Sequence, residues 1–329
     1  MSDPWVDEMR QAIELAYLGP RSENPRVGCV IVDSSGAVVG QGSHQGAGTA
    51  HAEVVALDQA GDRAKGATAV VTLEPCRHTG RTGPCTEALL AAGIARVVYA
   101  QGDPTKTASG GATVLREAGI EVIAGVGADQ ALPINTAWTH VQVTGRPYVV
   151  LKLAQTLDGR VADSGGGPTA ITGPAARRLT HALRAESDAV LVGTSTALVD
   201  DPALTVREIG VERQPLRVVM GERDLPTGLR VFDDAAQTLV IRDRRPLTAL
   251  GLLSDAGVQQ VLIEGGPRLA AAFLEAALVD EVVWFLAPTL LGGGPVSIPE
   301  LGVPIAVDVT AVTRIGNDVM VRGRVAFAS

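Results

Sequence analysis

The stretch that decides the fold of the first half reads Glu74-Pro75-Cys76-Arg77-His78-Thr79-Gly80-Arg81-Thr82-Gly83-Pro84-Cys85, and His51-Ala52-Glu53 precedes it. One histidine and two cysteines provide three of the four ligands of a tetrahedral zinc site, and an open fourth position is typical of catalytic zinc. Glu53 lies two residues after His51, where its carboxylate can serve as the acid/base partner of a water in that position. The pattern predicts a catalytic zinc site with His51, Cys76 and Cys85 as ligands and Glu53 as the catalytic residue.

Other interpretations of these residues remain open. Cys76 and Cys85 are also compatible with a hydrophobic core or a closed structural zinc, and a lone histidine before a helix is commonly a surface residue. We expect a helix to start at residues 51–55, a strand at 67–73 and a second helix at 86–92. The candidate ligands would then lie at helix starts and at a strand end, where active sites form in open α/β sheets, and this favours the catalytic interpretation.

Composition excludes several classes of function. The chain has 329 residues, which suits two domains, and 46% of them are hydrophobic. A formal charge of −8 and an aromatic content of 3% argue against nucleic acid as a partner. Three cysteines give no disulfide framework and predict a cytoplasmic location. No apolar run has the length of a membrane span, and a start with Asp3 and Pro4 is unlike a signal peptide.

Both halves alternate short apolar strands with helices, which predicts the α/β class with covered sheet faces. The first half is expected to open with a helix capped by Asp3 and beginning at Pro4, followed by a hairpin at residues 29–40. Thr144-Gly145-Arg146-Pro147 breaks the pattern, so we place domains at residues 1–145 and 146–329.

The second half contains no cysteine, so its chemistry requires a cofactor. A strand expected at residues 260–263 ends at Glu264-Gly265-Gly266-Pro267, directly before a helix. Glycines at such a turn let the backbone approach a pyrophosphate, and the helix start offers unpaired N–H groups. Taken alone, such a Gly-Gly-Pro turn is more often ordinary turn chemistry than a pyrophosphate site.

The motifs of the first half resemble the deaminase half of the bifunctional riboflavin-biosynthesis deaminase–reductase family. The resemblance rests on residues 24–28, His44, His51-Ala52-Glu53 and the stretch from Glu74 to Cys85, whose long cysteine spacing separates this family from other zinc deaminases. It implies a cytidine-deaminase-like three-layer α/β/α domain that hydrolytically deaminates a diaminopyrimidinone ribosyl phosphate. It also implies a set of substrate-binding residues: Asn24, His44, His78, Arg81 and Asp103. Asp103-Pro104-Thr105 looks like the family's phosphate-side Asp-Pro-Asn loop, with a Thr hydroxyl that can still donate to phosphate.

The second half resembles the reductase half of the same family, with a dihydrofolate-reductase-like α/β fold that uses NADPH to reduce ribosyl to ribityl. The motifs that carry this likeness are Lys152, Leu157-Asp158-Gly159, Gly193-Thr194, Asp200 to Thr205, Glu264 to Pro267 and Leu290 to Gly293. The resemblance implies cofactor-binding residues Ala154, Ala170, Thr196, Asp200, Gly265, Gly266, Pro267, Arg268, Leu269 and Ala270. It implies substrate-binding residues Pro168, Arg184, Leu204, Arg207 and Glu264, with the two arginines clamping a phosphate.

The sequence of the second half differs from the family pattern at two places. Pro168-Thr169-Ala170 replaces the usual Ser-x-Trp, and Arg268 stands where Thr is usual. One alternative is therefore a deaminase whose second half has lost turnover. A nucleic-acid-editing deaminase and a nucleotide-binding protein with structural zinc are further alternatives. The leading interpretation is a cytoplasmic two-activity enzyme that binds Zn²⁺ and NADPH, acts on small pyrimidine ribosyl phosphates and forms a homo-oligomer through its reductase domain.

Overall fold

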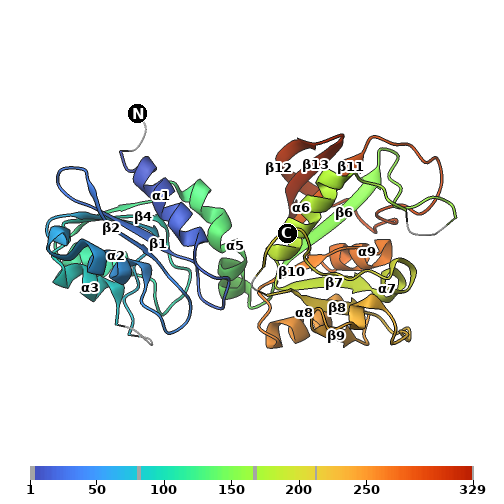
Figure 1. The fold of residues 1–329 in the computed structure, drawn as a ribbon, viewed down its shortest axis with the longest axis horizontal. Helices are drawn as coiled ribbons and strands as arrows, with labels where there is room; N and C mark the ends of the chain where they lie inside the picture. The colour runs from blue at the N-terminus through green and yellow to red at the C-terminus, as the bar shows by residue number, and fades with distance from the viewer. Residues whose placement is uncertain (1–3, 80–82, 166–168, 212, 328–329) are drawn as a thin grey trace. The chain divides into compact units, whose positions relative to one another are not determined.

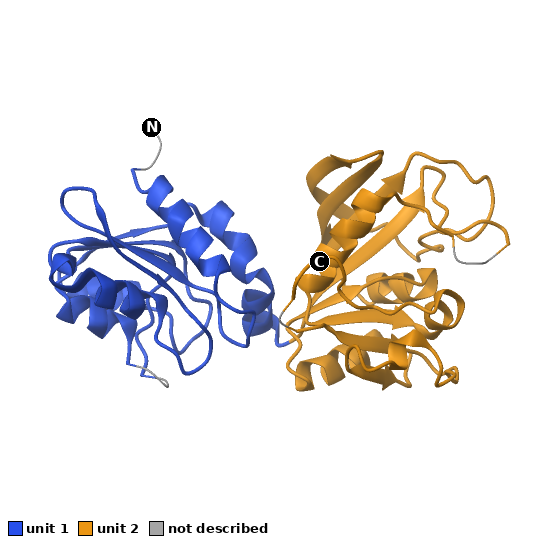
Figure 2. Cartoon of the chain, in the orientation of Figure 1, with its two compact units in different colours: residues 1–145 blue, residues 146–329 orange. Residues whose placement is uncertain are grey.

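The computed structural model describes residues 4–79, 83–165, 169–211 and 213–327 (Figure 1). The chain divides into two compact units, Met1–Gly145 and Arg146–Ser329 (Figure 2). No helix in the described part of the chain is long and apolar enough to cross a membrane.

The first unit is built on a five-stranded sheet of order β2-β1-β3-β4-β5. Strand β1 runs antiparallel to β2 and β3, whereas β3, β4 and β5 are mutually parallel. The strands are β1 (Gly28–Val32), β2 (Val38–Ser43), β3 (Thr68–Leu73), β4 (Arg96–Gln101) and β5 (Glu121–Ala124). All residues of β1 and β3 are buried, which is expected of strands covered on both faces.

Helices cover both faces of this sheet and make a three-layer α/β/α unit (Figure 1). Because side chains alternate along a strand, Cys29 and Ile31 of β1 pack in the core with α2 and α3, while Val30 and Val32 pack with α1 and α5. The helices are α1 (Val6–Tyr17), α2 (Ala52–Ala60), the 3-10 turn η1 (Gly61–Ala64), α3 (Cys85–Ala91), α4 (Gly111–Glu117) and α5 (Ala128–Thr144).

Glycines in β2 allow α2 to lie directly on the sheet. A Cβ atom at Gly42 would lie 2.0 Å from the carbonyl oxygen of Ala52, and one at Gly40 would lie 2.1 Å from that of Ala56. Any larger residue would push the helix away. This close packing fixes the start of α2, where His51 and Glu53 lie.

The second unit contains an eight-stranded sheet of order β12-β13-β11-β6-β10-β7-β8-β9. The six strands from β11 to β9 in that order are parallel, and β13 and β12 add an antiparallel edge. The strands are β6 (Tyr148–Thr156), β7 (Ala189–Gly193), β8 (Leu216–Met220), β9 (Thr238–Ile241), β10 (Gln260–Ile263), β11 (Glu281–Ala287), β12 (Ala306–Ile315) and β13 (Asp318–Ala326).

The helices of this unit are α6 (Pro174–Ala185), α7 (Thr194–Asp200), the 3-10 turn η2 (Arg230–Phe232), α8 (Pro246–Asp255) and α9 (Pro267–Glu275). Leu253 of α8 and Phe273 of α9 pack with Leu151 of β6 in the larger core. Ala197 of α7 packs with Val190 in a second core. The predicted α/β class is therefore confirmed in both units.

Some elements differ from the sequence-based expectations. The first helix begins at Val6, not at Pro4, and Asp3 lies outside the described residues. Helix α5 was not predicted, because Pro133 and the non-helical Asn135 inside it interrupt the pattern. Strands β11 to β13 and helix α8 were not predicted either. Most of β12 is exposed, so it lacks the buried apolar run that indicates a strand.

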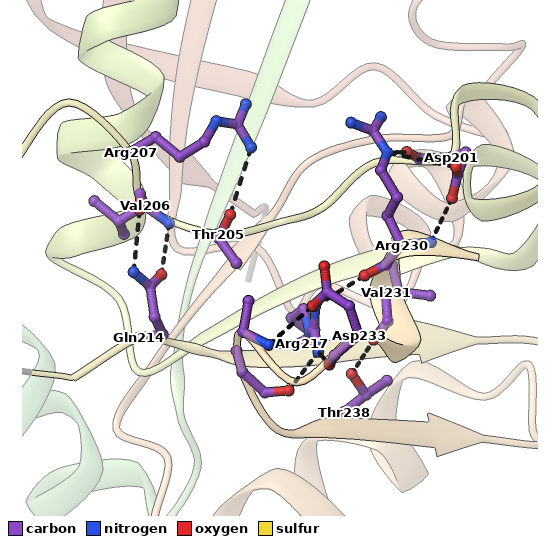
Figure 3. A network of polar contacts seen from close by, with 12 residues as sticks. Asp201, Thr205, Val206, Arg207, Gln214, Arg217, Arg230, Val231, Asp233 and Thr238 are labelled. Atoms are coloured by element: carbon purple, nitrogen blue, oxygen red, sulfur yellow. Dashed lines mark hydrogen bonds and ion pairs between the residues drawn. The ribbon is translucent and has the colours of Figure 1, made fainter. Parts of the chain in front are cut away.

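A fully buried arginine holds the connection between β8 and β9 (Figure 3). Arg217 Nη1 donates to Arg230 O at 3.0 Å and to Asp233 Oδ1 at 2.6 Å. Its Nη2 donates to the carbonyl oxygens of Asp233 and Ala236. These bonds satisfy carbonyl groups that would otherwise lose their partners beside the sheet edge.

We expect Arg217→Met to lower the melting temperature of the second unit's unfolding transition by at least about 4 °C. Loss of these charge-assisted bonds should cost about 2 kcal/mol or more, and a unit of this size loses about 2–4 °C per kcal/mol. Differential scanning calorimetry measures this shift. Arg213→Met is the control, because Arg213 is 78% exposed and its ion pair with Asp188 is 3.7 Å long. Equal melting temperatures for the two variants would contradict the prediction.

Candidate active sites

Three side chains from three different elements form a candidate metal site in the first unit. His51 directly precedes α2, Cys76 follows β3, and Cys85 is the first residue of α3. Their ligand atoms all lie within 4.8 Å of one another. His51 Nδ1 is 3.0 Å from Cys85 Sγ and 3.6 Å from Cys76 Sγ. Tetrahedral zinc with bonds of about 2.0–2.3 Å places such donors about 3.5–3.8 Å apart. The distance to Cys76 lies in this range, and the distance to Cys85 would have to widen by about 0.5 Å to admit the ion.

The protonation of the two cysteines also suits a metal site. The thiol of Cys85 donates to Cys76 and lowers the pKa of Cys76 to about 4. Because Cys85 shares its proton with Cys76 and is buried, its own pKa is raised. The bond to Cys76 raises the pKa of His51. A cation that replaces the shared proton would hold both sulfurs as thiolates, the form that binds metal.

Glu53 lies in the first turn of α2 beside this cluster, with 3% of its surface exposed. Burial raises the pKa of its carboxyl. A carboxyl group with a raised pKa is closer to the working pH and can both accept and return a proton. Its position and environment fit the acid/base role predicted from the sequence.

A cavity of about 420 Å³ opens onto this cluster. It brings together most of the residues that the sequence analysis singled out for the deaminase: Asn24, His44, His51, Glu53, Cys76, His78 and Asp103. Cys85 is fully buried behind the wall. Arg81 lies outside the described residues. The convergence of segments from β1, β2, α2 and β3 on one cavity agrees with a substrate site there, while the individual substrate contacts stay predictions.

The hydrogen bonds of His44 determine what Asn24 can offer to a ligand. His44 Nδ1 lies 3.2 Å from Ala50 O, a pure acceptor, so Nδ1 carries the proton of the neutral ring. Burial lowers the pKa of His44, which favours that neutral form. His44 Nε2 is then an acceptor for Asn24 Nδ2 at 3.3 Å. The amide oxygen of Asn24 is therefore the atom with which it can accept a hydrogen bond from a ligand.

The loop at Asp103 differs from the expectation. The backbone N–H of Thr105 and its hydroxyl both donate to Asp103 Oδ1, at 2.8 and 2.6 Å. The same hydroxyl accepts from Ala108 N at 3.2 Å. Since a hydroxyl has one proton, Thr105 gives it to Asp103 in this structure and not to a phosphate. Thr105 stabilises the loop in this way, and a contact of its hydroxyl with a phosphate stays a prediction.

Several residues of the cavity were not predicted. Glu74 receives three backbone N–H groups: Oε1 from Gly110 and Ala112 at 3.1 and 2.9 Å, and Oε2 from Asp103 at 3.3 Å. It thereby holds the loop that forms one wall. The position of Glu74 directly before Pro75-Cys76 is the sequence signal from which its place beside the cavity could have been predicted. Trp138 and Gln142 also line the cavity, and both belong to the unpredicted helix α5.

The second unit has a cavity of about 730 Å³ at the carboxyl ends of its parallel strands. Among its lining residues are the following predicted ones: Ala154, Ala170, Thr196, Asp200, Glu264, Gly265, Gly266 and Pro267. Arg268, Leu269 and Ala270 belong to α9 but do not line it; Arg268 is exposed and Ala270 lies in the core. Pro168 is outside the described residues. Side-chain contacts of Arg268 and Ala270 with a ligand in this cavity are thus not supported.

The turn at Gly265 and Gly266 fits a pyrophosphate. The φ angles of these residues are +122° and +79°, conformations that favour glycine. A Cβ at Gly265 would meet no atom within 4 Å, so the backbone here borders open space. Helix α9 starts at the next residue, Pro267, and leaves its first N–H groups without helical partners. These features suit the dinucleotide expected from the sequence.

Arg184 and Glu264, both expected near the sugar phosphate, form an ion pair with each other. Arg184 is buried, its Nε and Nη2 donate to Glu264 at 2.5 and 2.9 Å, and its Nη1 donates to Thr205 O at 2.8 Å. Although burial would raise the pKa of Glu264, the Arg184 charge lowers it. Arg207 is exposed, and its Nη1 reaches the Thr205 hydroxyl at 3.4 Å (Figure 3). Arg184 thus contacts the carbonyl oxygen of Thr205, and Arg207 contacts its hydroxyl. The charge of Arg184 is already paired with Glu264. A phosphate clamp formed by both arginines stays a prediction.

Leu204 and Lys152 differ in what they can offer to a ligand. Leu204 is 1% exposed and packs in the core with Val190, so only its main chain is left to contact a ligand. Its φ of +52° shows that the loop before Arg207 is strained. Lys152 lines the cavity; its burial lowers its pKa, and Glu264 opposes that shift.

Asp158 connects the Leu157-Asp158-Gly159 motif with the motif from Leu290 to Gly293, which lies 133 residues further along the chain at Leu291. Its carboxylate accepts from the backbone N–H groups of Leu291 and Gly292, with Gly292 N at 2.7 Å. Hydrogen bonds from Thr156 and from these groups lower the pKa of Asp158 to about 2. The Leu157-Asp158-Gly159 turn thus anchors the loop after β11.

Comparison with known proteins supports both halves of this description. Residues 6–101 match the cytidine and deoxycytidylate deaminase zinc-binding region, and residues 147–321 match the RibD C-terminal domain. The riboflavin biosynthesis protein RibD of Mycobacterium tuberculosis (strain ATCC 25618 / H37Rv) is 47% identical over 306 residues, which cover 91% of this chain and 89% of that protein. RibD of Escherichia coli (strain K12) is 42% identical over 322 residues, covering 86% and 88%.

Solved structures agree. The crystal structure of a diaminohydroxyphosphoribosylaminopyrimidine deaminase/5-amino-6-(5-phosphoribosylamino)uracil reductase from Thermotoga maritima matches with a TM-score of 0.89 and 33% identity, covering 98% of this chain and 99% of that one. Acinetobacter baumannii RibD, form 1, matches with a TM-score of 0.86 and 39% identity over 97% and 98%. A zinc-ligand cluster in a cytidine-deaminase-like unit and a reductase unit in one chain, at these identities, show that the protein belongs to the RibD family of riboflavin biosynthesis.

Proposed function

We propose that this chain carries out two consecutive steps of riboflavin biosynthesis. The first is hydrolytic deamination of 2,5-diamino-6-(ribosylamino)pyrimidinone 5′-phosphate to the aminouracil, in the unit of residues 1–145. The second is NADPH-dependent reduction of the ribosyl group to ribityl, in the unit of residues 146–329. The observation that carries this proposal is the convergence of His51, Cys76, Cys85 and Glu53 on one cavity.

The residues of the first unit divide the work of deamination. Zinc, when bound by His51, Cys76 and Cys85, supplies the Lewis acidity that makes water a nucleophile near neutral pH. Glu53 takes a proton from the attacking water and delivers protons to the ring nitrogen and the departing ammonia. Asn24, held by His44, accepts a hydrogen bond from the pyrimidine. Asp103 borders the cavity on the loop that Glu74 holds.

In the second unit the chain's task is to bind and orient. NADPH, when bound, supplies the hydride. Gly265 and Gly266 receive the pyrophosphate, and Thr196 and Asp200 border the same cavity. The ion pair between Arg184 and Glu264 fixes the wall beside them and reaches the loop that carries Arg207. Because the Ser-x-Trp pair is replaced by Pro168-Thr169-Ala170, we expect weaker ground-state binding than in relatives, with a smaller effect on the hydride step.

The cysteine chemistry supports a cytoplasmic location. Cys76 and Cys85 bind zinc only as thiolates, and a reducing compartment keeps them in that state. Small-molecule substrates without a nucleic-acid or membrane partner remain part of the proposal.

We also propose a homo-oligomer through the second unit. Strand β12 forms one edge of the eight-stranded sheet, and Val309 and Val312 on it are 52% and 66% exposed. A bulge between Val309 and Ala311 places the two valines on the same face, because Val309 pairs with Gly323 and Val312 with Val321. An exposed edge strand with apolar side chains is a typical surface for association with a second copy.

We expect Glu53→Gln to lower the deamination rate at least about 10²-fold while zinc content stays at one per chain, because Glu53 moves protons and is not a ligand. The matched variant Cys85→Ser should lose both zinc and deamination. Product analysis by mass and metal analysis measure the two quantities. A Glu53→Gln variant that deaminates at the wild-type rate would refute the assignment.

For the reductase step, Gly265→Val should weaken NADPH binding at least about tenfold, because the side chain would project into the open space beside the turn and strain the backbone. Binding can be followed by calorimetry, and turnover by NADPH absorbance with the deaminated intermediate as substrate. Glu275→Ala, at the exposed far end of α9, is the control. If wild-type protein neither binds nor consumes NADPH, the deaminase-only alternative replaces this proposal.

For the oligomer, the double change Val309→Lys and Val312→Lys should shift the sedimentation mass toward the monomer, because it places charge on the proposed apolar edge. This variant should keep both the deaminase and the reductase activity. The double change Leu247→Lys and Leu252→Lys on α8 is the control, since it adds equal charge at two exposed leucines elsewhere in the same unit. A wild-type chain that sediments as a monomer at micromolar concentration would exclude the oligomer.

A further inference from the structure

We propose that Asn135 is a positioning residue of the deaminase site, which fixes the substrate-binding segment 24–27 and acts on the substrate through Asn24. This inference rests on the deaminase function proposed above. It assigns a role in that function to helix α5.

The side-chain amide of Asn135 pairs with the backbone of Arg26 at both of its ends. Asn135 Oδ1 accepts from Arg26 N at 2.9 Å, and Asn135 Nδ2 donates to Arg26 O at 2.9 Å. Asn135 is 7% exposed, so water does not readily replace these bonds. The pair is the side-chain equivalent of one rung of a β-ladder, and it fixes both the place and the orientation of this peptide segment.

The backbone of α5 is distorted at the residue that makes this pair. Asn135 has φ −125° and ψ 19°, outside the helical region, and Pro133 precedes it by two residues within the helix. A proline inside a helix removes the hydrogen bond to the carbonyl four residues earlier and kinks the helix, and α5 is kinked at Asn135. The residue at which the helix is distorted is therefore the same residue whose side-chain amide binds segment 24–27.

The segment held by Asn135 forms part of the deaminase cavity. Asn24, Pro25 and Val27 all line that cavity. Val27 O accepts from His44 N at 3.0 Å, and Asn24 Nδ2 meets His44 Nε2 at 3.3 Å. Segment 24–27 is therefore bonded to α5 at Arg26 and to His44 at Asn24 and Val27, and His44 Nδ1 contacts Ala50, the residue before His51.

Helix α5 also contributes to the cavity directly. Trp138 and Gln142 line it, and they lie three and seven residues after Asn135. Residues at these spacings share one face of a helix. One face of α5 therefore both holds segment 24–27 and forms the wall next to it, which argues for a role in the site over a purely local role in the helix.

A second tether makes the proposed role separable from folding. Arg26 Nη2 donates to Ile134 O at 3.1 Å, and its guanidinium lies 4.9 Å from the centre of the Tyr17 ring. Without the Asn135 amide, the segment stays attached through the Arg26 side chain and through Val27 O, but the backbone N–H and C=O of Arg26 lose these partners. The expected consequence is weaker substrate binding in a folded unit.

The experiment compares Asn135→Ala and Asn135→Asp with Thr136→Ala. Aspartate keeps the shape and can accept from Arg26 N, but cannot donate to Arg26 O, so it serves if the alanine variant folds poorly. Thr136 is the matched control, because its hydroxyl donates to Leu132 O within α5 at 2.8 Å. Both Asn135 variants should raise the KM of deamination about tenfold or more, with a smaller change in kcat. Zinc content and NADPH-dependent reduction should stay unchanged, as should all parameters of Thr136→Ala.

A double-mutant cycle with Asn24→Ala tests the route of the effect. If Asn135 acts through Asn24, Asn135→Ala should add little in the Asn24→Ala background, whereas independent effects multiply. Hydrogen exchange at Arg26 should be faster in Asn135→Ala than in Thr136→Ala. Unchanged KM in both Asn135 variants, multiplying effects or unchanged exchange would each overturn the inference. A wild-type chain that does not deaminate would instead overturn the proposed function.

Discussion

The constraint on which the first unit depends is that one histidine and two cysteines from separate elements must meet within 4.8 Å. Such a meeting requires that α2, the end of β3 and the start of α3 be held against one another to within about 0.5 Å. The glycines of β2 meet this requirement on one side, because they let α2 lie on the sheet. On the other side, Cys85 N donates to Cys76 Sγ at 3.4 Å and Thr86 N donates to Cys76 O at 3.2 Å.

Several loops of the two units are held by polar side chains that receive or donate more than one hydrogen bond each. Glu74 collects three N–H groups of the Asp103 loop, Asp158 holds the loop after β11, and Arg217 holds the connection after β8. Gln214 makes a pair with the backbone of Val206 that resembles the pair of Asn135 with Arg26 (Figure 3). A loop has no ladder of its own, so its backbone groups need such partners if a binding residue on it is to keep one position.

The sequence predicted the metal ligands and Glu53 because these residues occur at spacings that only a few folds use, and the α/β class because strands and helices alternate. It did not predict α5, since Pro133 and the non-helical Asn135 interrupt the helical pattern. The resemblance placed Arg184 and Glu264 near a sugar phosphate, but the sequence did not show that these two side chains, eighty residues apart in the chain, pair with each other. Such pairs depend on which strands become neighbours, and neither composition nor local spacing contains that information. Thr105 gives its proton to Asp103 for a reason of the same kind, namely a turn geometry that a sequence motif does not specify.

Glu53 and Glu264 show how one side chain acquires two different properties from its surroundings. Both carboxyl groups are deeply buried, and burial by itself raises the pKa of each. Glu264 has the guanidinium of Arg184 against it in a bidentate pair, and the net effect is a lowered pKa and a fixed negative charge. For Glu53 the largest effect is burial, which the nearby His51 offsets only in part, and its pKa is raised. A carboxylate held ionised by a cation is suited to fixing neighbouring groups in place, whereas one whose pKa lies nearer neutrality is suited to carrying a proton between water and substrate. The same residue type therefore serves as a structural anion in one unit and as an acid/base group in the other, and the difference comes from the presence of one buried arginine.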